Sequence, residues 1–178
     1  MHFKSNILIL PGLGNSGVGH WQTLWEEEFK FKRVQQQNWD NPVLNDWITV
    51  IDKAIIDNGV SNVILVAHSL ACTTVAAWAK AFSRPIKAAL LVAPSDTEAE
   101  TYPTGTTGFN PMVLDKLPFP SITVISTNDY YVTAERAAFF AVCWGSDLVS
   151  IGDAGHINVA TGFGEWNKGL ELLMQLDE

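Results

Sequence analysis

The sequence predicts an α/β fold, in which a mostly parallel sheet of about six strands is covered by helices on both faces. Short apolar runs alternate along the chain with longer stretches whose apolar residues recur every three or four positions. The runs lack the polar alternation of a half-exposed strand, so we expect strands that are buried on both faces. Such strands, joined by helical crossovers, form a three-layer sandwich.

The predicted strands are five clear apolar runs and one weaker run. The first covers residues 7–10 and is closed by Pro11 and Gly12, which mark the start of a loop. The other clear runs are residues 63–66, 88–92, 122–125 and 148–151, and the weaker run is residues 33–37.

The predicted helices lie between these runs. An apolar stripe over residues 43–55 follows Asn41, the expected N-cap, and Pro42, the expected first helical residue. The other predicted helices are residues 70–82, residues 134–144 before Gly145, and a final amphipathic stripe from Phe163 to Leu173.

The chain is expected to form a single domain over residues 1–178, because this length suits one core and is short for two. Residues 95–120 break the alternation, since they are rich in Thr, Pro and Gly and show no period. A segment of this kind is either a lid or wall of a binding site or a disordered surface loop. The sequence leaves both possibilities open.

Composition excludes several classes of function. The net charge of −8, with no cluster of Lys and Arg, argues against binding to nucleic acid or to an anionic membrane surface. Two cysteines are too few for a disulfide framework, no apolar run is long enough to cross a membrane, and the first residues do not resemble a signal peptide. We therefore expect a cytoplasmic protein that acts on a small molecule.

The best candidate for a nucleophile is Ser69. It lies in the segment Ala67-His68-Ser69-Leu70-Ala71, directly after a predicted strand and at the start of a predicted helix. A nucleophile elbow needs this strand-to-helix turn, with small residues two positions before and after the serine. Alanines stand where glycines are usual, so the motif alone also fits an ordinary turn.

A serine hydroxyl needs a histidine base that is oriented by a carboxylate. Asp129 follows the predicted strand at 122–125 and His156 follows that at 148–151, in the chain order Ser, Asp, His of α/β hydrolases. Because the carboxyl ends of parallel strands share one edge, these three residues are expected to meet there. Asp96 also follows a strand, but we expect it to form an Asx turn or a helix cap.

The remaining candidate site residues lie in two loops. The N–H groups of Leu70 and Leu13 are the predicted oxyanion hole, and Gly12 and Gly14 would let the first loop approach a substrate closely. His20 and His68 are expected to line the site rather than to act as the base.

Two other functions fit parts of the sequence. Gly12, Gly14 and Gly17 form a G-x-G-x-x-G pattern after a strand, with Asp40 further on, as in Rossmann-type dinucleotide-binding oxidoreductases. That interpretation leaves the spacing of Ser69, Asp129 and His156 unexplained. A non-catalytic binding module on a hydrolase fold is the second alternative.

Five motifs give the chain a nearly end-to-end resemblance to a known family. They are Pro11-Gly12-Leu13-Gly14 with His20-Trp21, His68-Ser69-Leu70, Asn128-Asp129-Tyr130-Tyr131-Val132, Gly155-His156-Ile157-Asn158 and Gly162-Phe163-Gly164. The chain resembles the small serine hydrolases that include retinoblastoma-binding protein 9 and its bacterial relatives.

The resemblance implies an α/β-hydrolase fold with a shortened sheet and little or no cap, and a triad at Ser69, Asp129 and His156. We therefore expect a serine hydrolase that cleaves a small ester or amide through an acyl-enzyme intermediate. This mechanism requires no metal and no organic cofactor. It leaves the natural substrate and the oligomeric state open.

Overall fold

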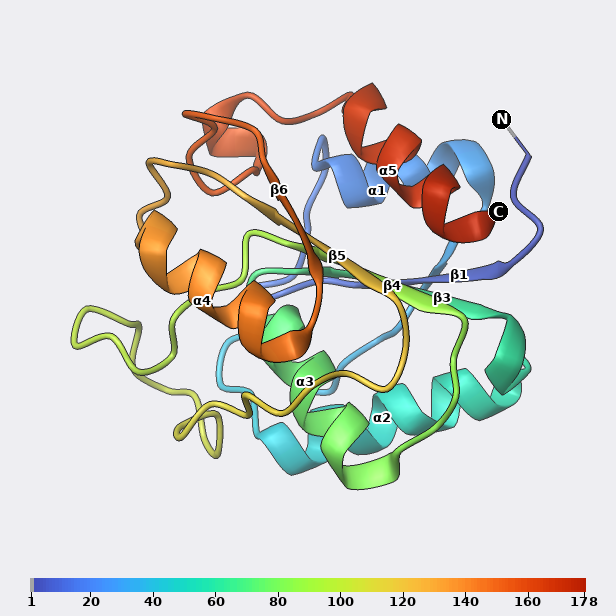
Figure 1. Cartoon of the computed structure of the whole chain (residues 1–178), viewed down its shortest axis with the longest axis horizontal. Helices are drawn as coiled ribbons and strands as arrows, with labels where there is room; N and C mark the ends of the chain where they lie inside the picture. The colour runs from blue at the N-terminus through green and yellow to red at the C-terminus, as the bar shows by residue number, and fades with distance from the viewer. Residues whose placement is uncertain (1) are drawn as a thin grey trace.

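A computed structural model describes residues 2–178 and contains one six-stranded sheet (Figure 1). The strand order is β2-β1-β3-β4-β5-β6, and every neighbouring pair is parallel. The strands are β1 (Asn6–Leu10), β2 (Lys32–Arg33), β3 (Val63–His68), β4 (Ala88–Val92), β5 (Ser121–Ile125) and β6 (Asp147–Ser150). All six carboxyl ends therefore meet at one edge of the sheet.

Helices cover both faces of the sheet, as the sequence predicts (Figure 1). On one face lie α1 (Trp21–Phe29) and α5 (Asn167–Asp177), and on the other lie α2 (Leu44–Asp57), α3 (Leu70–Phe82) and α4 (Ala134–Trp144). The predicted bounds of α3 and α4 are confirmed, and Gly145 ends α4 in the left-handed conformation with φ 65°. The molecule has the α/β-hydrolase fold.

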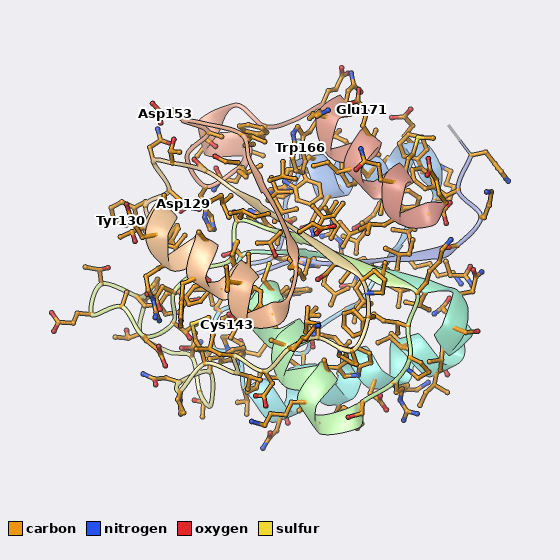
Figure 2. The ribbon with its side chains drawn as sticks, in the orientation of Figure 1. Asp129, Tyr130, Cys143, Asp153, Trp166 and Glu171 are labelled. Atoms are coloured by element: carbon orange, nitrogen blue, oxygen red, sulfur yellow. The ribbon has the colours of Figure 1, made fainter. Side chains whose placement is uncertain are left out.

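Each face of the sheet has its own hydrophobic core. Under α1 and α5 the tryptophans Trp21, Trp25 and Trp166 pack on side chains of the central strands. Trp21 meets Trp25 and Trp166 at ring-centroid distances of 4.6 and 5.1 Å. On the opposite face the small side chains of α3, among them the buried Cys72, allow that helix to lie close to the sheet. Cys143 is half-buried on α4 (Figure 2).

The structure corrects the predicted start of the second helix. Helix α2 begins at Leu44 with Val43 at the N-cap, so Asn41 is not the cap and Pro42 is not the first helical residue. The reason is a non-local pairing: Thr107 donates its N–H to the Pro42 carbonyl, and Leu44 donates its N–H to the Thr107 carbonyl. This bridge holds the chain extended through Val43.

Other boundaries also differ from those predicted. Strand β2 has two residues instead of residues 33–37, and α5 starts at Asn167, after the predicted start near Phe163. Strand β6 was expected to be buried on both faces, yet it is an edge strand and largely exposed. Helix α1 was not predicted.

Residues 95–120 form an ordered segment without helix or strand. Its side chains Phe109, Leu117 and Phe119 are buried in the core, and the Thr97 hydroxyl donates to the Phe109 carbonyl at 2.8 Å. The interpretation of this segment as a disordered surface loop is therefore wrong. Within residues 2–178, no helix is both long and apolar enough to cross a lipid bilayer.

Candidate active site

Ser69 lies at the sharp turn between β3 and α3. Its φ of 58° and ψ of −124° place a non-glycine residue in a strained backbone conformation, which a nucleophile elbow requires. Ala67 and Ala71 are almost completely buried on either side, so alanine is small enough for this strand and helix to pack.

The first loop touches the elbow at Gly12. A Cβ atom on Gly12 would lie 2.8 Å from the His68 carbonyl oxygen and 2.8 Å from the Ser69 Cβ. Only glycine permits this approach, which brings the Leu13 backbone next to the serine.

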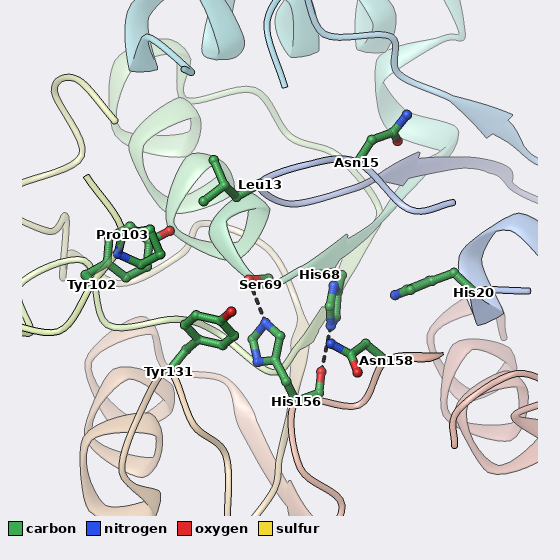
Figure 3. A pocket seen from close by; sticks show the side chains of 10 residues that line it. All are labelled: Leu13, Asn15, His20, His68, Ser69, Tyr102, Pro103, Tyr131, His156 and Asn158. Atoms are coloured by element: carbon green, nitrogen blue, oxygen red, sulfur yellow. Dashed lines mark hydrogen bonds between the residues drawn. The ribbon is translucent and has the colours of Figure 1, made fainter. Parts of the chain in front are cut away.

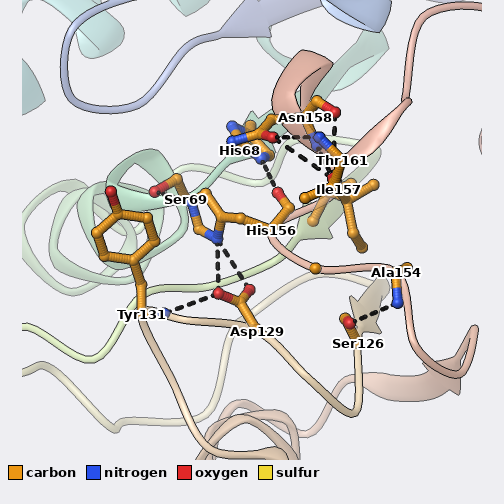
Figure 4. A network of polar contacts seen from close by, with 12 residues as sticks. His68, Ser69, Ser126, Asp129, Tyr131, Ala154, His156, Ile157, Asn158 and Thr161 are labelled. Carbon is orange, nitrogen blue, oxygen red and sulfur yellow. Dashed lines mark hydrogen bonds and ion pairs between the residues drawn. The ribbon is translucent and has the colours of Figure 1, made fainter.

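The structure brings Ser69, His156 and Asp129 into contact (Figure 4). The Ser69 Oγ lies 2.8 Å from the His156 Nε2, and the His156 Nδ1 lies 2.8 and 2.9 Å from the two Asp129 carboxylate oxygens. A carboxylate only accepts hydrogen bonds, so Nδ1 carries a proton and donates it, and in the neutral ring Nε2 accepts from the serine hydroxyl. The Tyr131 N–H, at 2.9 Å from Oδ1, orients the Asp129 carboxylate as well.

Asp96 lies in a separate cluster. Its carboxylate accepts hydrogen bonds from the Arg136 guanidinium at 2.9 and 3.2 Å and from the Glu98 N–H at 3.1 Å. The last contact is the expected Asx turn, and the pair with Arg136 could not be read from the sequence.

The loop that carries His156 is held by four side chains from three other parts of the chain, of which Figure 4 shows His68 and Ser126. We call residues 154–157 the His156 loop. Its N–H groups at Ala154 and Gly155 donate to Ser126 Oγ and Asn128 Oδ1, at 2.9 and 2.6 Å. Its carbonyl groups at His156 and Ile157 accept from His68 Nε2 and Trp21 Nε1, both at 2.9 Å. Each residue of the loop is thus fixed once.

Among the backbone N–H groups beside the serine, those of Leu13 and Leu70 have no hydrogen-bond partner within residues 2–178. The Leu70 group is at the N-terminus of α3, where the helix dipole favours negative charge. A Cβ on Gly12 would be only 3.2 Å from the Leu70 nitrogen, so the loop of Leu13 and the start of α3 lie close together.

A cavity of about 160 Å³ opens over the serine (Figure 3). Five of its lining residues were candidates from the sequence: Leu13, His20, His68, Ser69 and His156. Gly12 and Gly14, also predicted to contact substrate, are not among the described lining residues. Gly12 is buried against the elbow, and the Gly14 N–H donates to the Trp39 carbonyl at 2.9 Å.

The other lining residues were not identified from the sequence. They are Asn15, Tyr102, Pro103, Tyr131 and Asn158. Tyr102 and Pro103 belong to the 95–120 segment, which therefore forms a wall of the cavity. For Tyr131 and Asn158 a signal was present, because each is close in sequence to a predicted triad residue.

The histidines His20 and His68 stay uncharged near neutral pH. Burial, the Arg33 guanidinium and His156 lower the pKa of His20 to about 4. Complete burial holds the pKa of His68 well below its usual range, with smaller effects of His156 and His20 in the same direction. The cavity thus has neutral imidazoles on this side.

The G-x-G-x-x-G interpretation fails on packing. In dinucleotide-binding folds the third glycine allows close helix-strand packing, and a helix N-terminus faces the pyrophosphate. A Cβ on Gly17 would meet no atom within 4 Å, and α1 starts only at Trp21, with the His20 side chain capping it.

The serine hydrolase family model matches residues 7–175. The chain belongs to the serine hydrolase family. This agrees with the resemblance seen in the sequence.

Solved structures of bacterial hydrolases share the fold of this serine hydrolase. A protein described as a YdeN-like hydrolase from Pectobacterium atrosepticum is 30% identical, with a TM-score of 0.84 over 97% of this chain and 90% of that one. The ydeN gene product of Bacillus subtilis is 17% identical, with a TM-score of 0.82 over 97% and 98%. Est1E of Butyrivibrio proteoclasticus, solved with ferulic acid, is 17% identical, with a TM-score of 0.67 over 96% and 88%.

A search of curated proteins gave no match. Within the described residues, no group of three or more His, Cys, Asp or Glu side chains is placed to hold a metal ion. The chemistry available at this edge of the sheet is that of a hydroxyl, an imidazole, a carboxylate and two free N–H groups.

Proposed function

We propose that this serine hydrolase cleaves small carboxylic esters, with Ser69 as nucleophile, His156 as general base and Asp129 as the residue that orients the base. The observation that carries the proposal is the continuous contact from Ser69 Oγ through the imidazole to the Asp129 carboxylate, at 2.8 Å on each side.

The proposed reaction begins when Ser69 attacks the ester carbonyl and His156 Nε2 takes the hydroxyl proton. The N–H groups of Leu13 and Leu70 would bind the negative oxygen that develops. His156 then gives its proton to the leaving alcohol. Water attacks the acyl-enzyme and gives a proton to the same imidazole, which returns it to Ser69 Oγ as the acid leaves. The Asp129 carboxylate accepts the hydrogen bond of the Nδ1–H group throughout and stabilises the imidazolium.

The size of the cavity favours small substrates. Its volume of about 160 Å³ is close to that of an engineered cavity of about 150 Å³ that holds benzene. Acetyl to butyryl esters should therefore be hydrolysed faster than long-chain esters. A rate that climbs steadily from acetyl to palmitoyl would contradict this proposal.

A fluorophosphonate probe tests the proposed nucleophile. It should add covalently to Ser69 in wild type, and Ser69→Ala should abolish both the labelling and ester hydrolysis, with a loss of kcat on the order of 10³ or more. Ser83→Ala is the matched control, because Ser83 has a similar φ of 50° but lies at the far end of α3. Labelling of another residue, mapped by peptide mass spectrometry, would refute the assignment.

The alternative function, a non-catalytic binding module, leads to the opposite expectation. A module of that kind would bind small molecules without labelling at Ser69 and without turnover of any short ester. The same experiment therefore separates the two functions.

A further inference from the structure

Substrate selection, which presupposes the proposed ester hydrolysis, depends on the side chains that line the cavity. Four rings form a row along the cavity, with Tyr131 at one end and His20 at the other. Neighbouring ring centroids in the row are 4.6 Å apart for Tyr131 and His156, 4.9 Å for His156 and His68, and 5.0 Å for His68 and His20. The triad histidine thus has an aromatic neighbour on one side and imidazoles on the other.

His20 presents a hydrogen-bond donor to the cavity. Its Nδ1 accepts the Gln22 N–H at 3.2 Å, as the N-cap of α1, so the proton of the neutral ring must be on Nε2. The Nε2–H group has no partner within residues 2–178, and Figure 3 shows the tip of the ring turned toward His68 and the cavity. The capping role therefore fixes the tautomer.

Asn158 presents a second donor for the same reason. Its Oδ1 accepts from the N–H and the hydroxyl of Thr161, at 3.3 and 3.4 Å, in a capping box. The amide Nδ2 has no partner in the described part of the chain, and the side chain lines the cavity beside His156 (Figure 3). The protein uses the acceptor atoms of both residues and leaves their donor atoms free.

The lining of the cavity also carries no fixed charge. None of the residues that line the cavity is Asp, Glu, Lys or Arg. Arg33, the cation that acts on His20, is paired with Glu26 at 2.7 Å and donates to Asn15, so its charge is compensated outside the cavity. A carboxylate bound here would lose water without meeting an opposite charge, which is costly.

We propose that His20 and Asn158 form a donor wall that binds an uncharged oxygen acceptor of the substrate, such as an ether or a second carbonyl oxygen. The opposite side, with Tyr102, Pro103 and Tyr131, takes the hydrocarbon part (Figure 3). The preferred substrate is thus a small neutral ester with an additional oxygen a few bonds from the scissile carbonyl.

Two pairs of isosteric esters test the donor wall. The acyl pair is p-nitrophenyl butyrate and p-nitrophenyl methoxyacetate, and the alcohol pair is butyl acetate and 2-methoxyethyl acetate. In each pair an ether oxygen replaces one methylene group. The measured quantity is the kcat/KM ratio of oxygen ester to hydrocarbon ester, compared between wild type and variants so that intrinsic reactivity cancels.

Two variants remove one donor each and keep the local cap. His20→Asn retains an acceptor for the Gln22 N–H but is too short to reach the cavity, and Asn158→Asp retains the acceptor for Thr161. Each variant should lower the kcat/KM ratio of oxygen ester to hydrocarbon ester by about three- to tenfold, the equivalent of one neutral hydrogen bond. Both variants should do so in the same one of the two ester pairs. Asn38→Asp is the matched control, because its Oδ1 accepts the N–H groups of Asp40 and Asn41 in an exposed turn.

Three other experimental results would each overturn a part of the proposal. Unchanged ratios in both pairs, for both variants, with wild-type hydrolysis intact, would overturn the donor wall and leave the proposed function standing. Faster wild-type hydrolysis of 3-acetoxypropionate, which carries a carboxylate, than of 2-methoxyethyl acetate would overturn the assignment to an uncharged acceptor. No hydrolysis of any ester, with Ser69 unlabelled by fluorophosphonate, would overturn the proposed function together with the wall.

Discussion

The contact of Gly12 with the nucleophile elbow predicts a large effect of a single methyl group. In Gly12→Ala the new Cβ would lie 2.8 Å from both the His68 oxygen and the Ser69 Cβ, and neither atom belongs to a flexible side chain. To reach the 3.4 Å of ordinary contact, the first loop must move away by about 0.6 Å. The Leu13 N–H moves with it, away from the proposed position of the oxyanion.

Two magnitudes follow from this displacement. A 1 Å misplacement at a reacting centre can lower the rate about 10²-fold, so we expect kcat to fall by about ten- to thirtyfold. Overpacking of this kind costs about 1–3 kcal/mol of unfolding free energy. For a chain of this length that corresponds to a Tm lower by about 3–10 °C.

The assay measures kcat and KM with a short ester, the rate of fluorophosphonate labelling, and Tm. Gly17→Ala is the control, because a Cβ there meets no atom within 4 Å and the φ of Gly17 is outside the left-handed region. It should keep both activity and Tm. Wild-type kcat in Gly12→Ala, or equal damage in Gly17→Ala, would refute the argument that the first loop is positioned by this contact.

Three further predictions concern the acid, the buried imidazole and the His156 loop. Asp129→Asn should lower kcat by about 10⁴-fold with KM little changed, whereas Asp96→Asn should weaken the pair with Arg136 and keep turnover near wild type; the reverse ranking in steady-state kinetics would move the acid to Asp96. The pKa of His20 is about 4 in the folded chain and 6.5 when exposed, so the unfolded chain binds an additional proton as the pH falls through this range. The contribution of His20 to the unfolding free energy should therefore drop by up to about 1.4 kcal/mol per pH unit from 6.5 to 4. Urea titrations should show a shallower drop for His20→Asn, and an equal slope would contradict the assignment. Trp21→Phe removes the donor to the Ile157 carbonyl, so unfolding free energy should fall by at least about 1–3 kcal/mol and kcat should fall as well; unchanged kcat would show that this anchor does not position His156.

Local signals were sufficient for much of the fold. The boundaries of α3 and α4 are readable because a strand ends at the Ser69 turn and Gly145 ends the later helix. The positions of Asp129 and His156 follow from strand ends, since a parallel sheet brings all its carboxyl ends to one edge. Contacts between distant segments were not readable. The pairing of Pro42 with Thr107 moves the start of α2, and the edge position of β6 depends on the whole strand order.

The same distinction applies to the site. The residues that carry out the proposed chemistry lie in recognisable motifs, but the residues that surround them do not. Tyr102 reaches the cavity from a segment without periodicity, and the donor roles of His20 and Asn158 depend on which of their atoms cap α1 and the 159–161 turn. Helix α1 was missed because its nine residues carry a short apolar stripe beside the acidic run at 26–28.

The four side-chain hydrogen bonds that hold the His156 loop affect hydrogen exchange at its backbone. The Ala154 and Gly155 amides belong to neither a helix nor a strand, yet each donates a hydrogen bond to a side chain, Ser126 Oγ or Asn128 Oδ1. Their exchange with solvent requires that the loop separate from Ser126 and Asn128, a local opening that costs far more free energy than the fraying of an ordinary loop. These two amides should therefore exchange more slowly than those of the surrounding loops, and the same hydrogen bonds keep His156, the proposed base, in place.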